Sequence, residues 1–345
     1  MKIGILISTV PFVRGGAEIL IRALHAKLSE YGHQALLVRI PFRWEPPQKI
    51  LEHMLACRLL RMPGVARVVA LNFPAFYVPH EDKIVWMLHQ FRPAYDLWKT
   101  PYQGLSDSPE GQEVRDFIVR ADNSYLAEAS RIFANSEVTS ARLKHFNGFD
   151  SDVLHPPLPY DHQFSCIEYG DYIFAPGNIN EAGRQLLLVQ SMAYCRSGVK
   201  LLLAGKSESK ANSDAIKVAI SKGRLEDRVT FLDRFISEEE KVDWFGRALA
   251  CAYIPYDEDS YGYVTLESLL SKKALITCND SGGIRELVKD KVTGRVVDAS
   301  PRALAEAMDG LYYDRAEARQ MGEAGYGLVK TLDINWDHVV RVLTA

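Results

Sequence analysis

Residues 2–8 read Lys-Ile-Gly-Ile-Leu-Ile-Ser (KIGILIS), a run that is apolar almost throughout. A strand that is buried on both faces of a parallel sheet has this composition. Gly15 and Gly16 follow, and then leucines recur every four residues at Leu20, Leu24 and Leu28, which predicts a helix over residues 17–31. This strand, turn and helix form the first unit of an α/β fold with parallel strands.

The same alternation continues along the rest of the chain. It predicts further strands at residues 34–40, 65–72, 84–88, 131–135, 172–175, 200–204, 229–232, 250–255 and 274–278. The last periodic segments predict helices over residues 303–313 and 316–330 and a short helical tail over 336–343. We therefore expect an α/β protein throughout.

A proline-rich connector separates two domains. Residues 153–161 read VLHPPLPYD, and three prolines within four residues exclude a central strand or helix. We predict a Rossmann-like N-terminal domain over residues 1–155 and a Rossmann-like C-terminal domain over residues 163–330.

Bulk properties exclude several classes of protein. With 345 residues, 47% of them hydrophobic, the chain can bury two cores of ordinary size. A net charge of −3 argues against a dedicated nucleic-acid binder. The five cysteines, Cys57, Cys166, Cys195, Cys251 and Cys278, are odd in number and lack CxxC spacing, which indicates reduced thiols and no zinc site. The start has no signal-peptide pattern and no stretch is apolar enough to span a membrane, so we expect a cytoplasmic protein.

One stretch departs from this neutral background. Residues 14–67 hold nine Lys and Arg against four Glu. Two interpretations remain open, a solvated helix face or a contact with an anionic membrane surface or acidic acceptor. The second would place the protein at the inner membrane face as a peripheral protein.

Residues just after the strands are the candidates for ligand binding, because ligands of open α/β sheets lie beyond the carboxyl ends of the strands. Gly15 and Gly16 open the first helix, where a backbone without side chains can approach an anion at the helix N-terminus. A mere tight turn is the alternative.

The most informative block is YIPYDEDSYGYVTLESLLSKKALITCNDSGGIR, residues 253–285. Gly262, Tyr263 and Val264 begin a helix whose N-terminus can meet a diphosphate, while Glu267 can accept two hydrogen bonds from a ribose diol. The alternative is that Asp259 and Glu267 are solvated acids near a helix start. A second glycine-rich turn at residues 281–283 favours ligand binding.

This block resembles the retaining glycosyltransferases of the GT4 family, in which an E-x7-E motif corresponds here to Asp259 through Glu267. The GGAE turn at 15–18, His89 within LHQFRPAYDLW, the SGG turn and the terminal LDINWDHVV extend the resemblance over nearly the whole chain. It implies the GT-B fold, two facing Rossmann-like domains with a cleft between them. It also implies that a terminal helix over about 335–345 packs back on the N-terminal, acceptor-side domain.

The resemblance further implies a reaction and a set of roles. A sugar would pass from a nucleotide diphosphate sugar to a hydroxyl acceptor, a glycan or lipid-linked molecule, with retention of configuration. The residues themselves favour a reaction without a metal or other cofactor, because Asp257 and Asp259 are typical of a solvated loop; a carboxylate pair that binds a metal ion is the alternative. Gly16, beside Gly15, would approach the donor phosphates, His89 and Asp259 the transferred sugar, and Glu267 the ribose. On its residue pattern alone, His89 is more typical of a structural histidine.

The chain departs from the family pattern in one loop. Where the family usually has an Arg and a Lys that contact the diphosphate, this sequence has Asn178 and Gly183. Losing one such stabiliser costs about 3–4 kcal/mol of transition-state stabilisation. Arg184 and Lys206 are the candidates to replace these cations. The rival functions are a catalytically degenerate scaffold that binds a glycan or partner, and a nucleotide-sugar epimerase.

Overall fold

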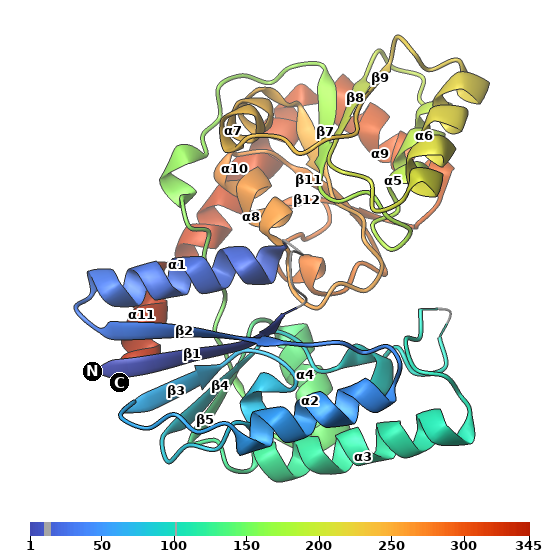
Figure 1. Cartoon of the computed structure of the whole chain (residues 1–345). Helices are drawn as coiled ribbons and strands as arrows, with labels where there is room; N and C mark the ends of the chain where they lie inside the picture. Colours follow the sequence, from blue (N-terminus) through green and yellow to red (C-terminus); the bar gives the residue numbers. More distant parts are fainter. Residues whose placement is uncertain (10–14, 101) are drawn as a thin grey trace. The chain divides into compact units, whose positions relative to one another are not determined.

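The computed structural model describes residues 1–9, 15–100 and 102–345, and these form two α/β units (Figure 1). The N-terminal unit comprises Met1–Pro159 together with Asn335–Ala345, and the C-terminal unit comprises Tyr160–Ile334. Within the described ranges each unit contains one six-stranded sheet, and every strand pair in both sheets is parallel.

The sheet of the N-terminal unit has the order β2-β1-β3-β4-β5-β6. Its strands are β1 (Lys2–Thr9), β2 (Gln34–Pro41), β3 (Arg67–Ala70), β4 (Lys83–Met87), β5 (Arg131–Ala134) and β6 (Asp152–Val153). Successive residues of β1 point to opposite faces, so that Ile5 joins one hydrophobic core and Leu6 the other. A strand buried on both faces has to be apolar throughout, which explains the composition of residues 2–8.

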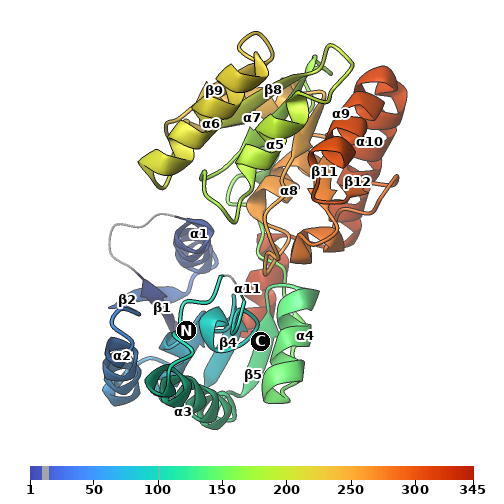
Figure 2. The ribbon, with the colours of Figure 1, turned by 90° about the vertical axis from the view of Figure 1, so that its right-hand side faces the viewer.

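Helices cover both faces of this sheet, as Figures 1 and 2 show. One face packs against α1 (Gly16–Glu30) and α11 (Trp336–Thr344), and the other against α2 (Gln48–Leu59), α3 (Pro109–Leu126) and α4 (Glu137–Asn147). The terminal helix α11 buries Trp336, Val339, Val340 and Leu343 in the same core as α1, and the indole N–H of Trp336 donates to the carbonyl of Leu158 at 2.9 Å. The end of the chain is thereby part of the N-terminal unit.

The sheet of the C-terminal unit has the order β12-β11-β10-β7-β8-β9. Its strands are β7 (Tyr172–Pro176), β8 (Lys200–Ala204), β9 (Val229–Leu232), β10 (Ala250–Ala252), β11 (Leu275–Cys278) and β12 (Gly294–Val297). One core is shared with α5 (Gln185–Met192), α6 (Lys210–Gly223), α9 (Pro301–Tyr313) and the first turns of α10 (Arg315–Thr331). The helices α7 (Glu238–Arg247) and α8 (Tyr263–Leu270) complete the unit, and Figure 2 shows α5 beside α6 and α9 beside α10.

The structure confirms the predicted α/β class and each of the predicted strands to within a few residues. The strand predicted over 250–255 ends earlier, at Ala252, and the following residues belong to a loop. Two strands were not predicted. The edge strand β6 has only two residues, and β12 begins with Gly294, where a Cβ atom would lie 2.0 Å from the carbonyl oxygen of Leu275.

Candidate functional site

Four loops of the C-terminal unit meet at the carboxyl ends of its strands. They follow β7, β8, β10 and β11, and hydrogen bonds between backbone groups join each to a neighbour. The donor and acceptor pairs are Ile179 N–H to Lys206 O at 3.0 Å, Tyr256 N–H to Ala182 O at 2.7 Å, Asp257 N–H to Asp280 O at 2.8 Å and Gly283 N–H to Glu258 O at 2.8 Å. The sequence-predicted C-terminal site residues therefore belong to one connected set of loops and the helix start next to them.

The N-terminus of α8 is shaped by a glycine. Gly262 precedes the helix with φ of +69°, and a Cβ atom there would lie 2.6 Å from the ring of Tyr253. Tyr263 and Val264 form the first turn and are half-buried, as is Asp259 in the preceding loop. The hydroxyl of Tyr263 is buried and has no hydrogen-bond partner among the described residues. A buried polar atom without a partner is a candidate ligand contact.

Glu267 is buried one turn further along α8 and is paired with a lysine. Lys241 of α7 donates to its Oε1 at 2.6 Å and also pairs with Glu238 at 2.8 Å. Burial raises the pKa of Glu267, and the charge of Lys241 opposes that shift. For Lys241, burial favours the neutral amine, but the two carboxylates outweigh it and leave its pKa raised. A lysine ammonium so close favours the ionised carboxylate that can accept hydroxyl hydrogen bonds.

Arg184 is engaged in holding the loops together. It precedes α5 with φ of +55°, and its guanidinium forms a bidentate ion pair with Asp280 at 2.7 and 2.8 Å. The same side chain donates to the carbonyls of Ile254 at 2.7 Å and Pro255 at 2.9 Å and to the hydroxyl of Ser281 at 3.3 Å. In this arrangement the guanidinium braces the loops after β10 and β11, which favours a structural role over the phosphate contact that we considered for it.

Lys206 has a different environment. Its side chain is 52% exposed and lies 3.6 Å from Asp233, whose pKa is lowered to about 2, chiefly by the backbone N–H of Ser207. An exposed pair of this kind is worth at most about 1 kcal/mol, so the ammonium can exchange its partner for a phosphate at little cost.

Asn178 and Gly183 are tied to one neighbouring side chain. Gln185 donates from Nε2 to the carbonyl of Asn178 at 2.9 Å, and a Cβ atom on Gly183 would lie 2.4 Å from the same Nε2. The backbone N–H of Gly183 donates to Asn180 at 2.6 Å. This loop is built around the residues present, and a lysine at position 183 would have to displace the Gln185 amide.

The other candidate residues belong to the N-terminal unit. His89 follows β4, is half-buried, and its Nδ1 lies 2.7 Å from the carbonyl oxygen of Gln90. Because a carbonyl only accepts, Nδ1 carries the proton and Nε2 is the acceptor in the neutral ring. Gly15 precedes α1 with an extended backbone (φ −161°), and a Cβ atom there would meet no described atom within 4 Å. The described geometry of Gly15 does not itself require a glycine, and Gly16 is the first residue of the helix.

A buried network close to His89 was not predicted from the sequence. Asp122 of α3 accepts hydrogen bonds from Tyr77 at 2.6 Å and Tyr95 at 2.5 Å, and burial raises its pKa to about 7. Asn147 donates to the Tyr95 hydroxyl at 3.1 Å and also contacts Gln90, the neighbour of His89. Asp122 lies within an amphipathic helix, and its partners come from distant loops, so no local pattern could have identified it.

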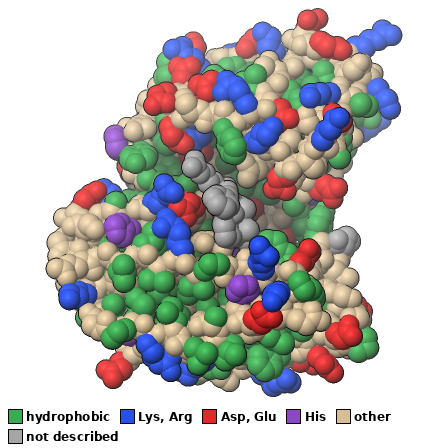
Figure 3. Space-filling model, in the orientation of Figure 1, with side chains coloured by type: hydrophobic (Ala, Val, Ile, Leu, Met, Phe, Trp, Pro, Cys, Tyr) green, Lys and Arg blue, Asp and Glu red, His purple; other side chains and the backbone are tan. Residues whose placement is uncertain are grey.

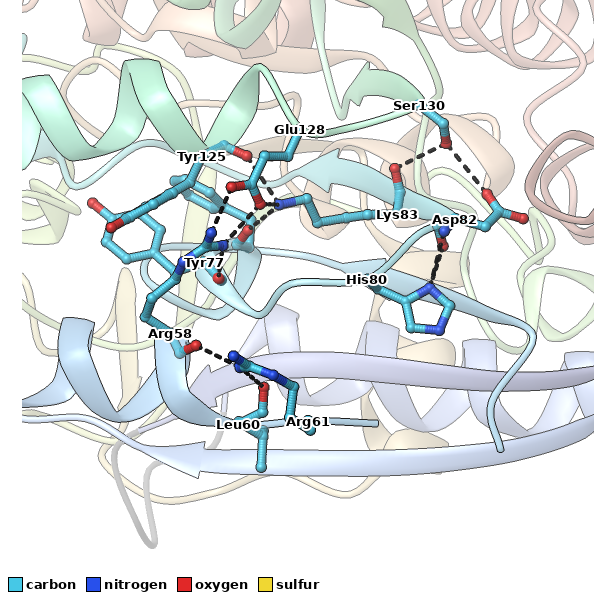
Figure 4. A network of polar contacts seen from close by, with 11 residues as sticks. Arg58, Leu60, Arg61, Tyr77, His80, Asp82, Lys83, Tyr125, Glu128 and Ser130 are labelled. Carbon is cyan, nitrogen blue, oxygen red and sulfur yellow. Dashed lines mark hydrogen bonds and ion pairs between the residues drawn. The ribbon is translucent and has the colours of Figure 1, made fainter. Parts of the chain in front are cut away.

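The basic stretch of residues 14–67 is largely neutralised; its first member, Arg14, lies outside the described residues. Six of its described cations pair with carboxylates: Arg22 and Arg39 with Glu18, Lys27 with Glu30, Lys49 with Glu52, Arg58 with Glu128, and Arg67 with Asp82. Figure 4 shows Arg58 and the buried Lys83 converging on Glu128, and Arg61 turned to the carbonyls of Arg58 and Leu60. Figure 3 shows positive and negative side chains interspersed on both units.

Within the described residues, no group of three or more His, Cys, Asp or Glu side chains is arranged to hold a metal ion. All five cysteines are free thiols. None of the described helices is long and apolar enough to cross a membrane.

The region that carries these loops matches a known protein family. Residues 167–328 match the family described as "Glycosyl transferases group 1". The C-terminal unit is a group 1 glycosyltransferase domain. The chain is also 26% identical over 224 residues to alpha-1,3/1,6-mannosyltransferase ALG2 of Mus musculus, covering 57% of this chain and 53% of that protein. This chain thus spans about half the length of that relative.

Solved structures share the whole architecture. Sucrose-phosphate synthase from Thermosynechococcus elongatus superposes with a TM-score of 0.78 at 18% identity, over 99% of this chain and 97% of that chain. Anabaena HepE in complex with UDP-glucose superposes with a TM-score of 0.72 at 15% identity, over 100% of this chain and 98% of that chain. These likenesses confirm the predicted GT-B class of two Rossmann-like domains.

Proposed function

We propose that this group 1 glycosyltransferase moves a sugar from a nucleoside diphosphate sugar to a hydroxyl acceptor, with retention of configuration, in the synthesis of a glycan, polysaccharide or glycoconjugate. The observation that carries the proposal is the start of α8, where a glycine-capped helix N-terminus lies next to the buried, lysine-paired Glu267. The structure of HepE with UDP-glucose supports a nucleotide-sugar donor for this fold.

Donor binding follows from the chemistry of these groups. The free N–H groups at the start of α8 favour an anion such as a diphosphate. Glu267 accepts the two ribose hydroxyls, and the adjacent ammonium of Lys241 favours its ionised form. The Tyr263 hydroxyl, buried without a described partner, is available for a further polar contact with the donor. Asp259, in the loop before the helix, contacts the donor sugar.

We assign the phosphate cation to Lys206 in preference to Arg184. Lys206 is half-exposed and weakly paired, whereas five contacts fix the guanidinium of Arg184 within the protein. A cation near the diphosphate stabilises the charge that develops on the leaving group. This assignment offsets the loss of the family cations at Asn178 and Gly183.

The N-terminal unit contributes the acceptor side of the reaction in this proposal. His89 approaches the transferred sugar, and the backbone at Gly15 and Gly16 approaches the donor phosphates, where side chains would obstruct it. We further propose that transfer requires no metal ion, and activity that persists undiminished in excess EDTA is the expected result.

The deciding experiment is a screen of sugar nucleotides against hydroxyl acceptors, with the products analysed by mass spectrometry. The proposal expects release of free nucleoside diphosphate together with a glycosylated acceptor. An isomerised sugar nucleotide formed without any acceptor would instead identify an epimerase. Nucleotide binding without turnover for any pair would identify a degenerate scaffold.

We also propose peripheral membrane contact through the N-terminal unit, as a lipid-linked acceptor would require. Along α2, Leu51, Leu55 and Leu59 recur every four residues, and Leu55 and Leu59 are 59% and 65% exposed. Figure 3 shows hydrophobic side chains gathered on this unit. Leucines on one side of a surface helix fit the boundary of a bilayer.

Flotation with vesicles that contain anionic lipids tests this contact. The double variant Leu55→Gln, Leu59→Gln should lose vesicle binding, while Val218→Gln, an exposed apolar position on α6, should keep it. Equal flotation of wild type and the double variant would exclude α2 as the contact.

A further inference from the structure

Cys166 has surroundings unlike those of the other four cysteines. Cys57, Cys195, Cys251 and Cys278 are buried, and burial raises the pKa of each thiol to about 12. Cys166 is half-exposed in the segment that precedes β7. An oxidant in solution can therefore reach Cys166, whereas the buried thiols are both shielded and held in the unreactive protonated form.

The Cys166 sulfur contacts a fully buried lysine. Lys273, between α8 and β11, lies with its Nζ 3.2 Å from the Cys166 sulfur and donates to the carbonyl of Glu168. Its ammonium also lies 4.0 Å from the ring centroid of Tyr169.

Lys273 lacks the partner that a buried lysine normally has. Among the described residues no carboxylate lies within ion-pair distance of its Nζ, and the Glu168 carboxylate pairs with Arg247 at 3.0 Å instead. A buried ammonium without an anion is costly. The Cys166 sulfur is in hydrogen-bond contact with this lysine, and a cysteine beside a lysine is a setting in which cysteines react with oxidants.

We propose that Cys166 and Lys273 form an oxidation-responsive pair that hydrogen peroxide converts into a covalent S–N cross-link. In the first step the Cys166 sulfur attacks one peroxide oxygen, the O–O bond breaks, and a sulfenic acid and water form. The sulfur is oxidised by two electrons, and the peroxide is reduced.

In the second step the Lys273 amine attacks the sulfenyl sulfur. The S–N bond forms, the S–O bond breaks, and the hydroxide leaves as water with a proton from the amine. Overall, one thiol, one amine and one peroxide give one sulfenamide and two waters. Burial lowers the pKa of Lys273, so its neutral, nucleophilic form is more accessible than that of a solvated lysine.

The cross-link would join two segments that are 107 residues apart in the sequence. It ties the segment before β7 to the turn that follows α8, the helix that carries Glu267. Covalent closure of a long loop stabilises a fold by restricting the unfolded chain. The oxidised protein should therefore unfold at a higher temperature than the reduced protein, and a thiol reductant should reverse the change.

Mass spectrometry after treatment with hydrogen peroxide tests the pair. The intact mass should fall by about 2 Da, the loss of two hydrogens, and digestion should give one peptide that links Cys166 to Lys273. Cys166→Ser should abolish the mass change, and Lys272→Met, the adjacent lysine, should retain it. In Lys273→Met a dimedone adduct should replace the cross-link at Cys166.

Three results would overturn the proposal. One is a dimedone adduct on wild-type Cys166 without any linked peptide. Another is a cross-link that persists in Lys273→Met, and the third is oxidation of a buried cysteine before Cys166. If Lys273→Met fails to fold, the first and third of these results can still be tested, because they need only wild type and Cys166→Ser.

Discussion

Asp122 and Glu267 are both deeply buried carboxylates, but the groups that surround them differ. Asp122 lies between two tyrosine hydroxyls in the N-terminal unit, and burial raises its pKa to about 7. Burial also raises the pKa of Glu267 in the C-terminal unit, but there the adjacent ammonium of Lys241 opposes the shift. A carboxyl group whose only contacts are hydroxyl donors can become neutral near physiological pH, whereas one beside a lysine favours the charged form. The surroundings of Asp122 suit a structural network, and those of Glu267 suit a site that binds hydroxyl groups of a ligand.

The largest expected effect is the loss of the buried ion pair in the C-terminal unit. Glu267→Ala leaves Lys241 largely buried without its nearer carboxylate, and breaking such a pair costs about 3–5 kcal/mol of stability. Because Lys241 keeps its contact with Glu238, we expect a value at the lower end, measured by urea unfolding. The control is Glu238→Ala, which removes the exposed partner of the same lysine and should change stability by less than about 1 kcal/mol. Equal losses in the two variants would contradict the distinction between Glu267 and Glu238.

The second prediction concerns the pH dependence of stability. The pKa of Asp122 is about 7 in the folded protein against an ordinary value of 3.8 for aspartate. Its contribution to the free energy of unfolding is therefore fully present below pH about 4 and is lost as the pH rises through 7. The whole effect is about 4 kcal/mol at most. Urea unfolding between pH 5 and 8 should show a falling stability in wild type and a flatter profile in Asp122→Asn. Parallel profiles would mean that Asp122 does not titrate in this range.

The two candidate phosphate cations provide the third test. Lys206→Met should weaken binding of a nucleoside diphosphate by up to about 10- to 100-fold, with little effect on the nucleoside alone or on stability. Arg184→Met should instead lower the stability of the protein, because it removes the ion pair between the Arg184 guanidinium and Asp280 in the loop after β11. Calorimetric titration with both ligands, alongside thermal unfolding, separates the two. If Arg184→Met keeps its stability but loses the diphosphate, the assignments are reversed.

The smallest effect on nucleotide binding is expected at His89. His89→Ala should leave the affinity for a free nucleoside diphosphate near that of wild type and lower turnover, because His89 belongs to the N-terminal unit and is proposed to meet the sugar. His89→Gln is the matched variant, since its amide retains hydrogen-bonding capacity. A loss of affinity as large as the loss of turnover would show that His89 maintains the structure of a binding site.

The sequence predicted the fold because its patterns are local. Buried strands such as β1 are apolar throughout, and the leucines of α1 recur along one face, so both can be recognised from a few residues. The pairings that define the candidate site are not local. Lys241 comes from a helix 26 residues before Glu267, and Arg184 reaches a carboxylate 96 residues away. Residue types and spacing therefore made Glu267 a candidate but could not show that Arg184 would be paired with Asp280.

The most direct test of the proposed donor site is the contact between Glu267 and the ribose. Calorimetric titration of wild type with UDP and GDP, and with the 2′-deoxy and 3′-deoxy analogues of whichever binds, measures that contact from the ligand side. Losing a hydrogen bond to a charged group costs ~1.5–3 kcal/mol, so the deoxy analogues should bind wild type about 10- to 150-fold more weakly. The same analogues should bind Glu267→Ala no more weakly than the parent nucleotide does, because the contact is already absent. Equal affinity of wild type for the ribose and deoxy forms, or an unchanged difference in Glu267→Ala, would contradict the account.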